Sequence, residues 1–567
     1  MGEQSRRRVL QAGLGAVAGS AALGRLGGTA GAAERAAAEA PAASTAGRPT
    51  GLPWVADLGD GRYQNPVLGA DWSDPDAVRV GPYFYLTAST FNRIPGLPIL
   101  RSRDLVNWTI IGHALTELEP RDVFSVPQHG NGVWAPAIRH HAGRFWIFYP
   151  DPDYGIFVTT AVDPSGPWTK PHVLKPGKGF IDPCPLWDDD GRAYLIHAYA
   201  KSRAGINNRL NLHEISPDGR ELLDDGRIVV NGDEIPGYTT LEGPKLYKRD
   251  GWYWIFAPVG GVTGGWQSAF RSRSILGPYE NRIVLAQGDT PINGPHQGAW
   301  VATERGEDWF LHFQDRGVYG RVVHLQPMRW RDDGWPVMGE DDGRGRGRGK
   351  PVLVYRKPAV GRPSKITAPA SGDEFTGHRP GEQWTWQANS DPSWASLRGG
   401  RLRLACPPSA DTADLRLLPN VLGQRFPAES FVATTSLTLH GRSTGARSGL
   451  VVLGYGYAWI GLQRLDSGLA LVHRTAAQDK AEIDAATPIP MPSGRSSVRL
   501  RVQVGPSGVC RFAADVDGRG FQPVGGPFTA SQGKWIGATL GLFGTAPVGA
   551  HGDAAEVDWF RVGPAEG

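Results

Sequence analysis

Cysteine is scarce in this sequence. Only three cysteines occur in 567 residues, Cys184, Cys406 and Cys510, and so small and odd a number excludes a disulfide framework. Cys406 and Cys510 leave one pairing open, because they fall in the same predicted domain. Cys184 is expected to be a small buried side chain rather than a nucleophile, since no partner base is evident beside it.

Helix-period segments and net charge are also scarce. With 77 glycines, 46 prolines and 10% aromatic residues, the composition is typical of an all-β protein with many turns. The length and the 40% hydrophobic content predict two domains with ample core. The net charge of +4 is small for this length, so the composition does not call for an acidic partner.

The first residues have the pattern of an export signal. Three arginines within residues 5–11 precede a Gly/Ala-rich stretch at 12–27, and residues 30–32 offer a small-residue cleavage site. This pattern is typical of twin-arginine export, with an ordinary secretory signal as the alternative. The apolar stretch is short and glycine-rich, which speaks against a permanent membrane anchor. We therefore predict a signal peptide over residues 1–32, a disordered spacer over 33–50 and a secreted protein.

Five segments share one frame: a short turn, an apolar run, a second turn and an aromatic strand. Three of the first turns carry an acid, namely Asp74, Asp182 and Glu242, and the other two lie at 134–136 and 296–298. Self-similarity at a spacing of roughly 45 to 60 residues indicates a ring of sheet blades. The sequence therefore predicts a five-bladed β-propeller in which the three carboxylates converge near the axis.

The region after the repeats changes character. Residues 358–372 contain three prolines and are predicted to be a linker. Short strands with alternating polar and apolar residues follow, for example at 498–502, as in a β-sandwich. The predicted fold class is therefore all-β, with a propeller over 51–357 and a concanavalin-like sandwich (jelly roll) over 373–564.

Three carboxylates suit the hydrolysis of a glycosidic bond. One carboxyl group must protonate the leaving oxygen, while another activates water or attacks the sugar. A third carboxylate beside the proton donor raises the donor's pKa by like-charge repulsion and helps to orient it. Asp and Pro also favour turns for purely structural reasons. The register of the acids across the repeats favours the catalytic interpretation.

A series of motifs stands in order along the predicted propeller. They are Asn65-Pro66-Val67, Asp71-Trp72-Ser73-Asp74-Pro75-Asp76, Ser102-Arg103-Asp104-Leu105, Trp134-Ala135-Pro136, Ile181-Asp182-Pro183, Glu242-Gly243-Pro244 and Gly294-Pro295-His296-Gln297-Gly298. Together they resemble those of glycoside hydrolase family 43. Residues 373–562 are similar to the sandwich that follows the propeller in the β-xylosidase and α-L-arabinofuranosidase branch of that family.

The resemblance implies a role for each acid. Asp74 matches the general base that activates water, and Glu242 matches the general acid. Asp182 matches the residue that modulates the pKa of the acid and orients it. Family members invert the anomeric centre, which requires the base and the acid to stand roughly 6.5 to 9.5 Å apart.

Further positions match the surroundings of the sugar. Phe91 and Arg321 match residues that wall and hydrogen-bond the terminal sugar, and a guanidinium can bind two hydroxyls. Trp72 and Trp134 are candidate stacking platforms, with packing inside the blades as the equal alternative. Residues 92–94 replace the acidic or aromatic run of many relatives, and we expect them to lie where the pocket discriminates between sugars.

A structural calcium ion is expected, and no cofactor is expected for the chemistry. The resemblance places His296 near the propeller axis, where a calcium ion or another cation is often held largely through water; a structural histidine is the alternative. A second calcium is expected near Asp373 and Asp558. Each of these acids belongs to an acid-aromatic pair, with Phe375 and Phe560 respectively, and the pairs predict that the first and last strands of the sandwich lie side by side.

The combined prediction is an inverting exo-glycosidase that removes terminal α-L-arabinofuranosyl or β-D-xylosyl units from plant polysaccharides or oligosaccharides. One alternative is a retaining fructan hydrolase, whose Asn-Asp-Pro-Asn-Gly turn is absent at 73–77. Another is a decayed carbohydrate-binding propeller, against which the three acids speak. Neither nucleic acid nor, after signal cleavage, a membrane is an expected partner, because the Gly/Arg alternation at 341–350 is expected to be a solvated loop. The number of subunits is left open.

Overall fold

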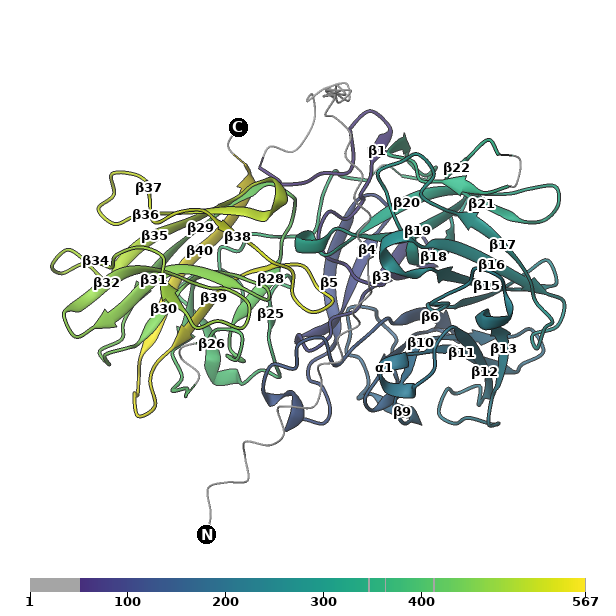
Figure 1. The fold of residues 1–567 in the computed structure, drawn as a ribbon, viewed down its shortest axis with the longest axis horizontal. Helices are drawn as coiled ribbons and strands as arrows, with labels where there is room; N and C mark the ends of the chain where they lie inside the picture. The colour runs from purple at the N-terminus through teal and green to yellow at the C-terminus, as the bar shows by residue number, and fades with distance from the viewer. Residues whose placement is uncertain (1–50, 345–346, 363, 411–413, 566–567) are drawn as a thin grey trace, which may run out of the picture. The chain divides into compact units, whose positions relative to one another are not determined.

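The computed structural model describes residues 51–344, 347–362, 364–410 and 414–565, so the predicted signal peptide and spacer lie outside the described residues. The described chain is almost entirely β-structure (Figure 1). Its two α-helices, α1 (Lys201–Ala204) and α2 (Gly261–Gly264), are single turns. No helix in these ranges is long and apolar enough to cross a membrane.

Five antiparallel sheets follow one another along the first part of the chain. Blade 1 contains β2 (Asp76–Val80), β3 (Tyr83–Thr87), β4 (Gly96–Ser102) and β5 (Trp108–Leu115). Blade 2 contains β6 (Ala137–His141), β7 (Arg144–Asp151), β8 (Gly155–Ala161) and β9 (His172–Pro176). Blade 3 contains β10 (Phe180–Trp187), β11 (Ala193–Tyr199), β12 (Arg209–Ile215) and β13 (Arg227–Asn231).

The last two blades differ at their outer edge. Blade 4 contains β14 (Lys245–Arg249), β15 (Trp252–Val259), β16 (Trp266–Ser272) and β17 (Glu280–Leu285), and is extended by the hairpin of β22 (Glu340–Asp341) and β23 (Gly349–Lys350). Blade 5 contains β18 (His296–Ala302), β19 (Asp308–Asp315), β20 (Arg321–Trp330) and β21 (Pro336–Met338). The Gly/Arg run at 341–350 was predicted as a plain loop, and its ends instead pair as β22 and β23; residues 345–346 lie outside the described ranges.

The predicted frame falls on the first two strands of every blade. Each turn singled out in the sequence precedes or opens the first strand, and each aromatic segment is the second strand. The first strands of blades 1 to 4 lie against one another in order, and β18 of blade 5 lies against both β15 of blade 4 and β2 of blade 1, so the ring is closed. The prediction of a five-bladed propeller is confirmed.

The N-terminal segment of the propeller runs along blade 5. β1 (Arg62–Gln64) pairs with β24 (Val354–Arg356), and Tyr63 Oη donates to the carbonyl of Leu325 at 2.7 Å. Asn65 donates to the same carbonyl and accepts from the Leu325 N–H, while Leu68 pairs with Val323. These contacts bring the turn that holds Asp74 next to the start of β20.

Two larger sheets form the second part of the chain. One contains β25 (Thr385–Trp386), β28 (Leu422–Arg425), β39 (Thr539–Thr545), β30 (Arg447–Leu453), β31 (Tyr457–Leu465), β32 (Gly468–Ala476), β33 (Ile483–Asp484) and β34 (Ile489–Pro490). The other contains β26 (Ala395–Arg398), β27 (Arg401–Ala405), β40 (Ala554–Pro564), β29 (Phe431–Leu439), β35 (Ser497–Val504), β36 (Val509–Asp515), β37 (Gln522–Pro523) and β38 (Phe528–Thr529). The β-sandwich prediction is confirmed.

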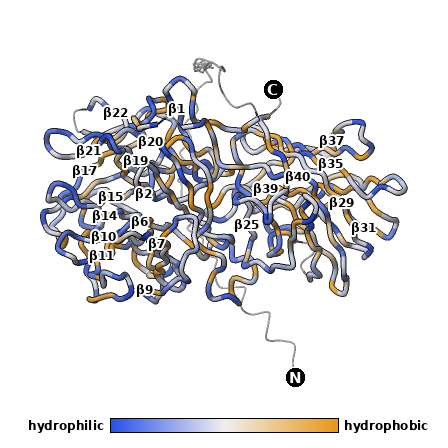
Figure 2. Tube along the Cα trace, turned by 180° about the vertical axis from the view of Figure 1, so that it is seen from behind, coloured by the Kyte–Doolittle hydropathy of each residue, from blue (hydrophilic) through white to orange (hydrophobic). Residues whose placement is uncertain are grey.

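The alternation read from the sequence decides which face of each strand is buried. Along β35, Val498, Leu500 and Val502 are buried, whereas Arg499 is exposed. Figure 2 shows the same alternation as orange and blue segments along the strands. The first and last strands of the sandwich lie side by side as predicted, because Asp373 and Phe560 exchange two backbone hydrogen bonds of 2.6 and 2.7 Å.

All three cysteines are buried free thiols. Cys184 lies in β10 with no exposed surface, and it accepts hydrogen bonds from Arg139 and from the Leu246 N–H. It is therefore a buried packing residue, as predicted. Burial raises the pKa of both Cys406 and Cys510 to about 12, which makes these thiols unreactive near neutral pH.

Two blades contain a buried pair of stacked histidines at matching positions. His197 of β11 stacks on His213 of β12 with ring centroids 5.4 Å apart. His312 of β19 stacks on His324 of β20 with centroids 5.3 Å apart. In both pairs the first histidine lies on the second strand of its blade and the second on the third strand. The repeat is therefore preserved in the core as well as in the turns.

The stacked histidines are neutral. Nδ1 of His197 donates to the carbonyl of Ala198, and Nδ1 of His312 donates to that of Phe313. Nε2 of His312 then accepts from the Gln326 amide at 3.0 Å, which a protonated ring could not do. Burial lowers the pKa of His197 to about 3 and that of His312 to about 4.

This burial predicts a loss of stability in acid. A histidine whose pKa is lowered in the folded state binds more protons when unfolded, so its contribution falls as the pH drops below the unfolded value of about 6.5. Between pH 7 and pH 5 the His312→Gln variant should lose about 2 kcal/mol less unfolding free energy than wild type. Urea unfolding at both pH values measures this. His378→Gln, at an exposed site, is the control and should behave like wild type; equal losses in all three proteins would contradict the prediction.

Candidate active site

The carboxylate of Asp74 accepts hydrogen bonds from donors in blades 1 and 5. Its Oδ2 accepts from the hydroxyls of Ser73 and Ser89 at 2.8 and 2.6 Å. Its Oδ1 pairs with Nη1 of Arg321 at 2.8 Å. The residue is 5% exposed. All three contacts are donated to Asp74, as an ionised carboxylate requires.

Asp182 lies in an irregular part of β10. The register between β10 and β11 shifts between Ile181 and Cys184, and such a bulge redirects a side chain out of the regular ladder. Oδ2 of Asp182 accepts from the N–H of Gly243 at 2.8 Å. Burial first, and then the negative charges of Glu242 and Asp74, raise the pKa of Asp182. Asp182 therefore lies within electrostatic reach of both other predicted acids.

Glu242 is the most accessible of the three acids, with 26% of its side chain exposed. Its Oε1 lies 3.3 Å from Nε2 of His296, whose side chain is 2% exposed. Its backbone N–H donates to the carbonyl of Pro258, which anchors the turn on β15. Glu242 is thus fixed at its backbone while its carboxyl group reaches solvent.

Three residues of the site have strained backbone conformations. Asp74, Phe91 and Asp182 have positive φ angles of 54°, 53° and 57°, a region that residues other than glycine seldom occupy. Such conformations persist where the surrounding structure enforces them, commonly at functional sites. Asp is among the residues that tolerate this region best, which helps to explain why Asp occupies two of the three positions.

Arg321 connects the base side of the site to its surroundings. Besides Asp74, its Nη1 donates to Ser73 Oγ at 2.8 Å, and its guanidinium lies 4.8 Å from the ring centroid of Phe313. Its backbone N–H donates to Oδ1 of Asp71 at 2.9 Å. Oδ2 of the same Asp71 accepts from the N–H of Gly537 in the sandwich at 3.0 Å. Asp71 therefore fastens a sandwich loop to the start of β20.

Aromatic side chains from both domains gather beside Arg321. The rings of Phe91 and Trp134 lie 6.5 Å apart, and those of Trp134 and Trp535 lie 5.9 Å apart. Trp535 belongs to the sandwich loop before β39, is 41% exposed, and lies 5.9 Å from the Arg321 guanidinium. The sequence analysis missed Trp535. The available signal was a tryptophan in a glycine-flanked segment, between Gly533 and Gly537.

The structure does not support a stacking role for Trp72. It is 2% exposed and belongs to the core of blade 1 with Phe84 and Trp108, and Arg425 of the sandwich covers its ring at 4.1 Å. The alternative of packing inside the blade is therefore correct for Trp72. Trp134, in contrast, is only partly buried and stays beside the site.

The expectation for residues 92–94 is also wrong. Asn92 donates its amide to the carbonyl of Gln387, and Ile94 exchanges two backbone hydrogen bonds with Trp386 of β25. Arg93 donates to Oγ1 of Thr539 in β39. This segment docks the propeller onto the sandwich.

The expected calcium ligands fall into two groups. In the sandwich, Asp373 accepts from three N–H groups, and Asp558 pairs with Ser436 and Arg401. Both acids are committed to protein donors and do not form a cation site. At His296, Nδ1 is buried without a hydrogen-bond partner, but no group of three or more His, Cys, Asp or Glu side chains gathers as a metal site in the described ranges. Side chains alone do not complete a coordination shell there.

The arrangement can give and take a proton at separate places. Glu242 and Asp182 form a carboxyl pair in which burial and mutual repulsion favour the retention of a proton. Asp74 receives only donated hydrogen bonds and a guanidinium charge. Arg321 lies beside Asp74, and Trp535 lies beside Arg321. The arrangement therefore suits proton donation by one carboxyl group, proton acceptance by another and the binding of a hydroxylated ring.

Comparisons with known proteins agree with this site and fold. The model described as "Glycosyl hydrolases family 43" matches residues 63–336, and that described as "Beta xylosidase C-terminal Concanavalin A-like domain" matches residues 372–563. A putative beta-xylosidase of Xylanibacter ruminicola is 36% identical over 493 residues, 86% of this chain and 87% of that protein.

Two further matches extend the comparison. A non-reducing end alpha-L-arabinofuranosidase of Bacteroides ovatus is 29% identical over 420 residues, covering 70% of this chain and 75% of that protein. The crystal structure of a xylan beta-1,4-xylosidase from Bacillus halodurans superposes with a TM-score of 0.78 at 26% identity, covering 88% of this chain and 99% of that one. Because these matches span the propeller and the sandwich together, the chain belongs to glycoside hydrolase family 43 and is a glycoside hydrolase.

Proposed function

We propose that this protein is an inverting exo-glycosidase that removes terminal β-D-xylosyl or α-L-arabinofuranosyl units from plant cell-wall polysaccharides or oligosaccharides. The observation that carries the proposal is the contrast between two carboxyl environments. Asp74 is paired with Arg321 at 2.8 Å, whereas burial and the charge of Glu242 raise the pKa of Asp182 beside the partly exposed Glu242.

In the proposed reaction, Glu242 gives its proton to the glycosidic oxygen as the bond to the anomeric carbon breaks. Asp74 takes a proton from a water molecule whose oxygen bonds to that carbon from the opposite face. The product sugar therefore has the inverted configuration. Asp182 keeps Glu242 in place through the Gly243 N–H and supplies the neighbouring negative charge. Arg321 holds Asp74 in line and offers its remaining N–H donors to sugar hydroxyls.

The proposed preference for a terminal sugar rests on the aromatic residues. Phe91, Trp134 and Trp535 form a series of ring contacts that ends beside Arg321, and such an aromatic wall suits a single small ring. Xylopyranose and arabinofuranose present similar hydroxyl patterns to such a site. The names of the relatives, a beta-xylosidase and an alpha-L-arabinofuranosidase, support these two sugars as the ones to test first.

We also propose export by the twin-arginine route. This proposal rests on the arginines at 6–8. Replacing all three arginines by lysine should leave unprocessed protein in the cytoplasm, and normal secretion would contradict the proposal.

We further propose that a calcium ion is held near His296 largely through water. This proposal rests on the unpartnered Nδ1 of His296. Metal analysis of the purified protein should find calcium in a 1:1 ratio, and the absence of calcium would contradict the proposal.

Replacement of the proposed acid should have an effect that depends on the leaving group. Glu242→Gln should lower kcat by roughly 10²–10⁴-fold on xylobiose or an arabino-oligosaccharide, and by clearly less on a p-nitrophenyl glycoside, whose leaving group needs little protonation. Asp74→Asn should lower kcat similarly on both. Glu221→Gln, at an exposed site, is the control. An anomer-resolved proton NMR time course of wild type should show inversion, and retention would favour the fructan-hydrolase type of mechanism instead.

Removal of the charge at Asp182 should change the pH profile. In Asp182→Asn, one negative charge no longer helps to hold the proton of the carboxyl pair, so the basic limb of kcat/KM should move to lower pH. We expect kcat at the optimum to fall as well, because the Gly243 N–H loses a charged acceptor. Steady-state kinetics from pH 4 to pH 9 measure both effects. A lower kcat with an unshifted profile would reduce Asp182 to a purely structural role.

Truncation of Trp535 should weaken substrate binding. Trp535→Ala should lower kcat/KM by roughly three- to tenfold, mainly through KM, because an aromatic contact contributes about 0.5–1.5 kcal/mol. Trp535→Phe should retain most of the activity. Kinetics on a p-nitrophenyl glycoside, with circular dichroism as a check of the fold, test this. An unchanged KM in the alanine variant would place the ring outside the sugar site.

A further inference from the structure

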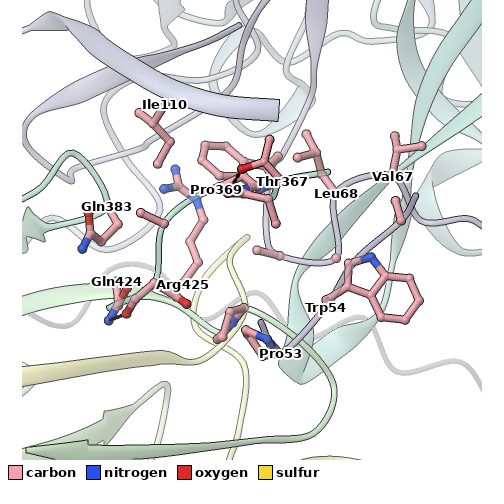
Figure 3. Close-up of a pocket in the computed structure, with 18 residues that line it drawn as sticks. Pro53, Trp54, Val67, Leu68, Ile110, Thr367, Pro369, Gln383, Gln424 and Arg425 are labelled. Atoms are coloured by element: carbon pink, nitrogen blue, oxygen red, sulfur yellow. Dashed lines mark hydrogen bonds between the residues drawn. The ribbon is translucent and has the colours of Figure 1, made fainter. Parts of the chain in front are cut away.

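A small cavity between propeller and sandwich holds two arginines. It is lined by Asp71, Thr90 and Arg93 from the propeller and by Thr385, Arg425 and Thr539 from the sandwich. Arg425 of β28 lines this cavity and also the neighbouring pocket drawn in Figure 3, where its side chain extends toward Ile110 of β5. Arg93 crosses in the opposite direction, to β39. Arginines from two different domains therefore line the same small cavity.

The two arginines are partly buried and make few hydrogen bonds. Among the described residues, Arg93 makes one hydrogen bond, to Thr539 Oγ1 at 3.3 Å, and Arg425 makes one, to the carbonyl of Asp71 at 2.5 Å. In the part of the chain that the structure describes, no carboxylate oxygen lies within 4.0 Å of either guanidinium group, so neither arginine forms an ion pair. A guanidinium has five N–H donors, so most of the donors on both arginines are left for whatever occupies the cavity.

Two of the threonine hydroxyls that line the cavity are already committed as donors. Thr385 Oγ1 donates to the carbonyl of Gly423, and Thr539 Oγ1 donates to that of Leu453 while accepting from Arg93. Their hydrogens are not available to the cavity. The guanidinium groups are therefore its principal donors, and the site as built offers hydrogen bonds and positive charge together.

The charge of the two arginines is only partly balanced. The Asp71 carboxylate lies within electrostatic reach of both, but its two oxygens already accept from the N–H groups of Arg321 and Gly537. Burial, and then the like charge of Arg425, lower the pKa of Arg93 to about 10, and burial lowers that of Arg425 to about 10. Two positive charges and one negative charge leave a net charge of one unit in a partly buried place, which a bound anion would compensate.

The size of the cavity limits what can compensate this charge. The space that the centre of a water molecule can occupy is about 20 Å³, close to the minimum for one enclosed water molecule. A sulfate, a phosphate or the carboxylate of an acidic sugar is larger than this space. The cavity therefore suits an occupant no larger than a monatomic ion, and a single negative charge would bring the cluster to neutrality.

We propose that Arg93 and Arg425 bind one chloride ion between the propeller and the sandwich. The ion would accept N–H groups from both domains and so fasten them together. The cavity also borders Ser89, which donates to Asp74, and Ile536, which neighbours Trp535. Chloride would thus stabilise the interface that carries both the base and the sandwich wall of the site. This proposal is independent of the sugar preference proposed above.

Chloride dependence can be measured on the intact protein. Melting temperatures are recorded in increasing sodium chloride and in sodium gluconate at equal ionic strength. Chloride should raise the melting temperature by a few degrees relative to gluconate, with saturation, because a ligand bound only by the folded state stabilises it. Crystals soaked in sodium bromide should show an anomalous peak between the two guanidinium groups. Equal melting curves in the two salts, or no bromide peak there, would overturn the proposal and leave the arginines merely hydrated.

Two variants locate the effect. Arg93→Met removes one guanidinium while keeping a long side chain, and it should abolish the difference between chloride and gluconate. Arg316→Met is the matched control, because Arg316 also crosses between the domains but is already paired with Glu429 at 2.6 Å, so its chloride response should equal that of wild type. A full response in Arg93→Met would also overturn the proposal. If that variant fails to fold, the bromide peak in wild type decides.

Discussion

The ion pair between Arg321 and Asp74 joins the last blade of the ring to the first. It forms only because residues 63–68 run along β20 and bring the acidic turn of blade 1 beside the start of that strand. Ring closure is therefore a condition for the chemistry as well as for stability. Any change that loosens the contact between the N-terminal segment and β20 also releases the proposed base.

Electrostatics divide the site into two halves. On one side a guanidinium and two hydroxyls face Asp74. On the other side the buried Asp182 has a backbone N–H as its hydrogen-bond donor and lies beside the charge of Glu242. The same residue type therefore meets a positive partner in one blade and a negative neighbour in another. This asymmetry lets a set of three similar carboxyl groups contain both a proton donor and a proton acceptor.

The sandwich is part of this arrangement and not an independent attachment. Asp71 holds both the Arg321 backbone and the Gly537 backbone, so the loop that carries Trp535 is tied to the residue that orients the base. Arg93 and residues 92–94 bind the sandwich from the propeller side. Arg93 and Arg425 make the junction between the two domains polar. They also line the cavity from which we infer an anion site.

The sequence by itself determined the repeat, the three acids and the two-domain order, because each depends on local patterns: turn chemistry, alternation along strands and a regular spacing. It did not determine the fate of Trp72, of residues 92–94 or of Trp535. Trp72 and Trp535 are both tryptophans in short turns, yet one is covered by Arg425 and the other stands beside Arg321. Those outcomes depend on contacts between residues hundreds of positions apart. Only the packing of the sandwich against the closed ring decides which ring is buried and which reaches the site.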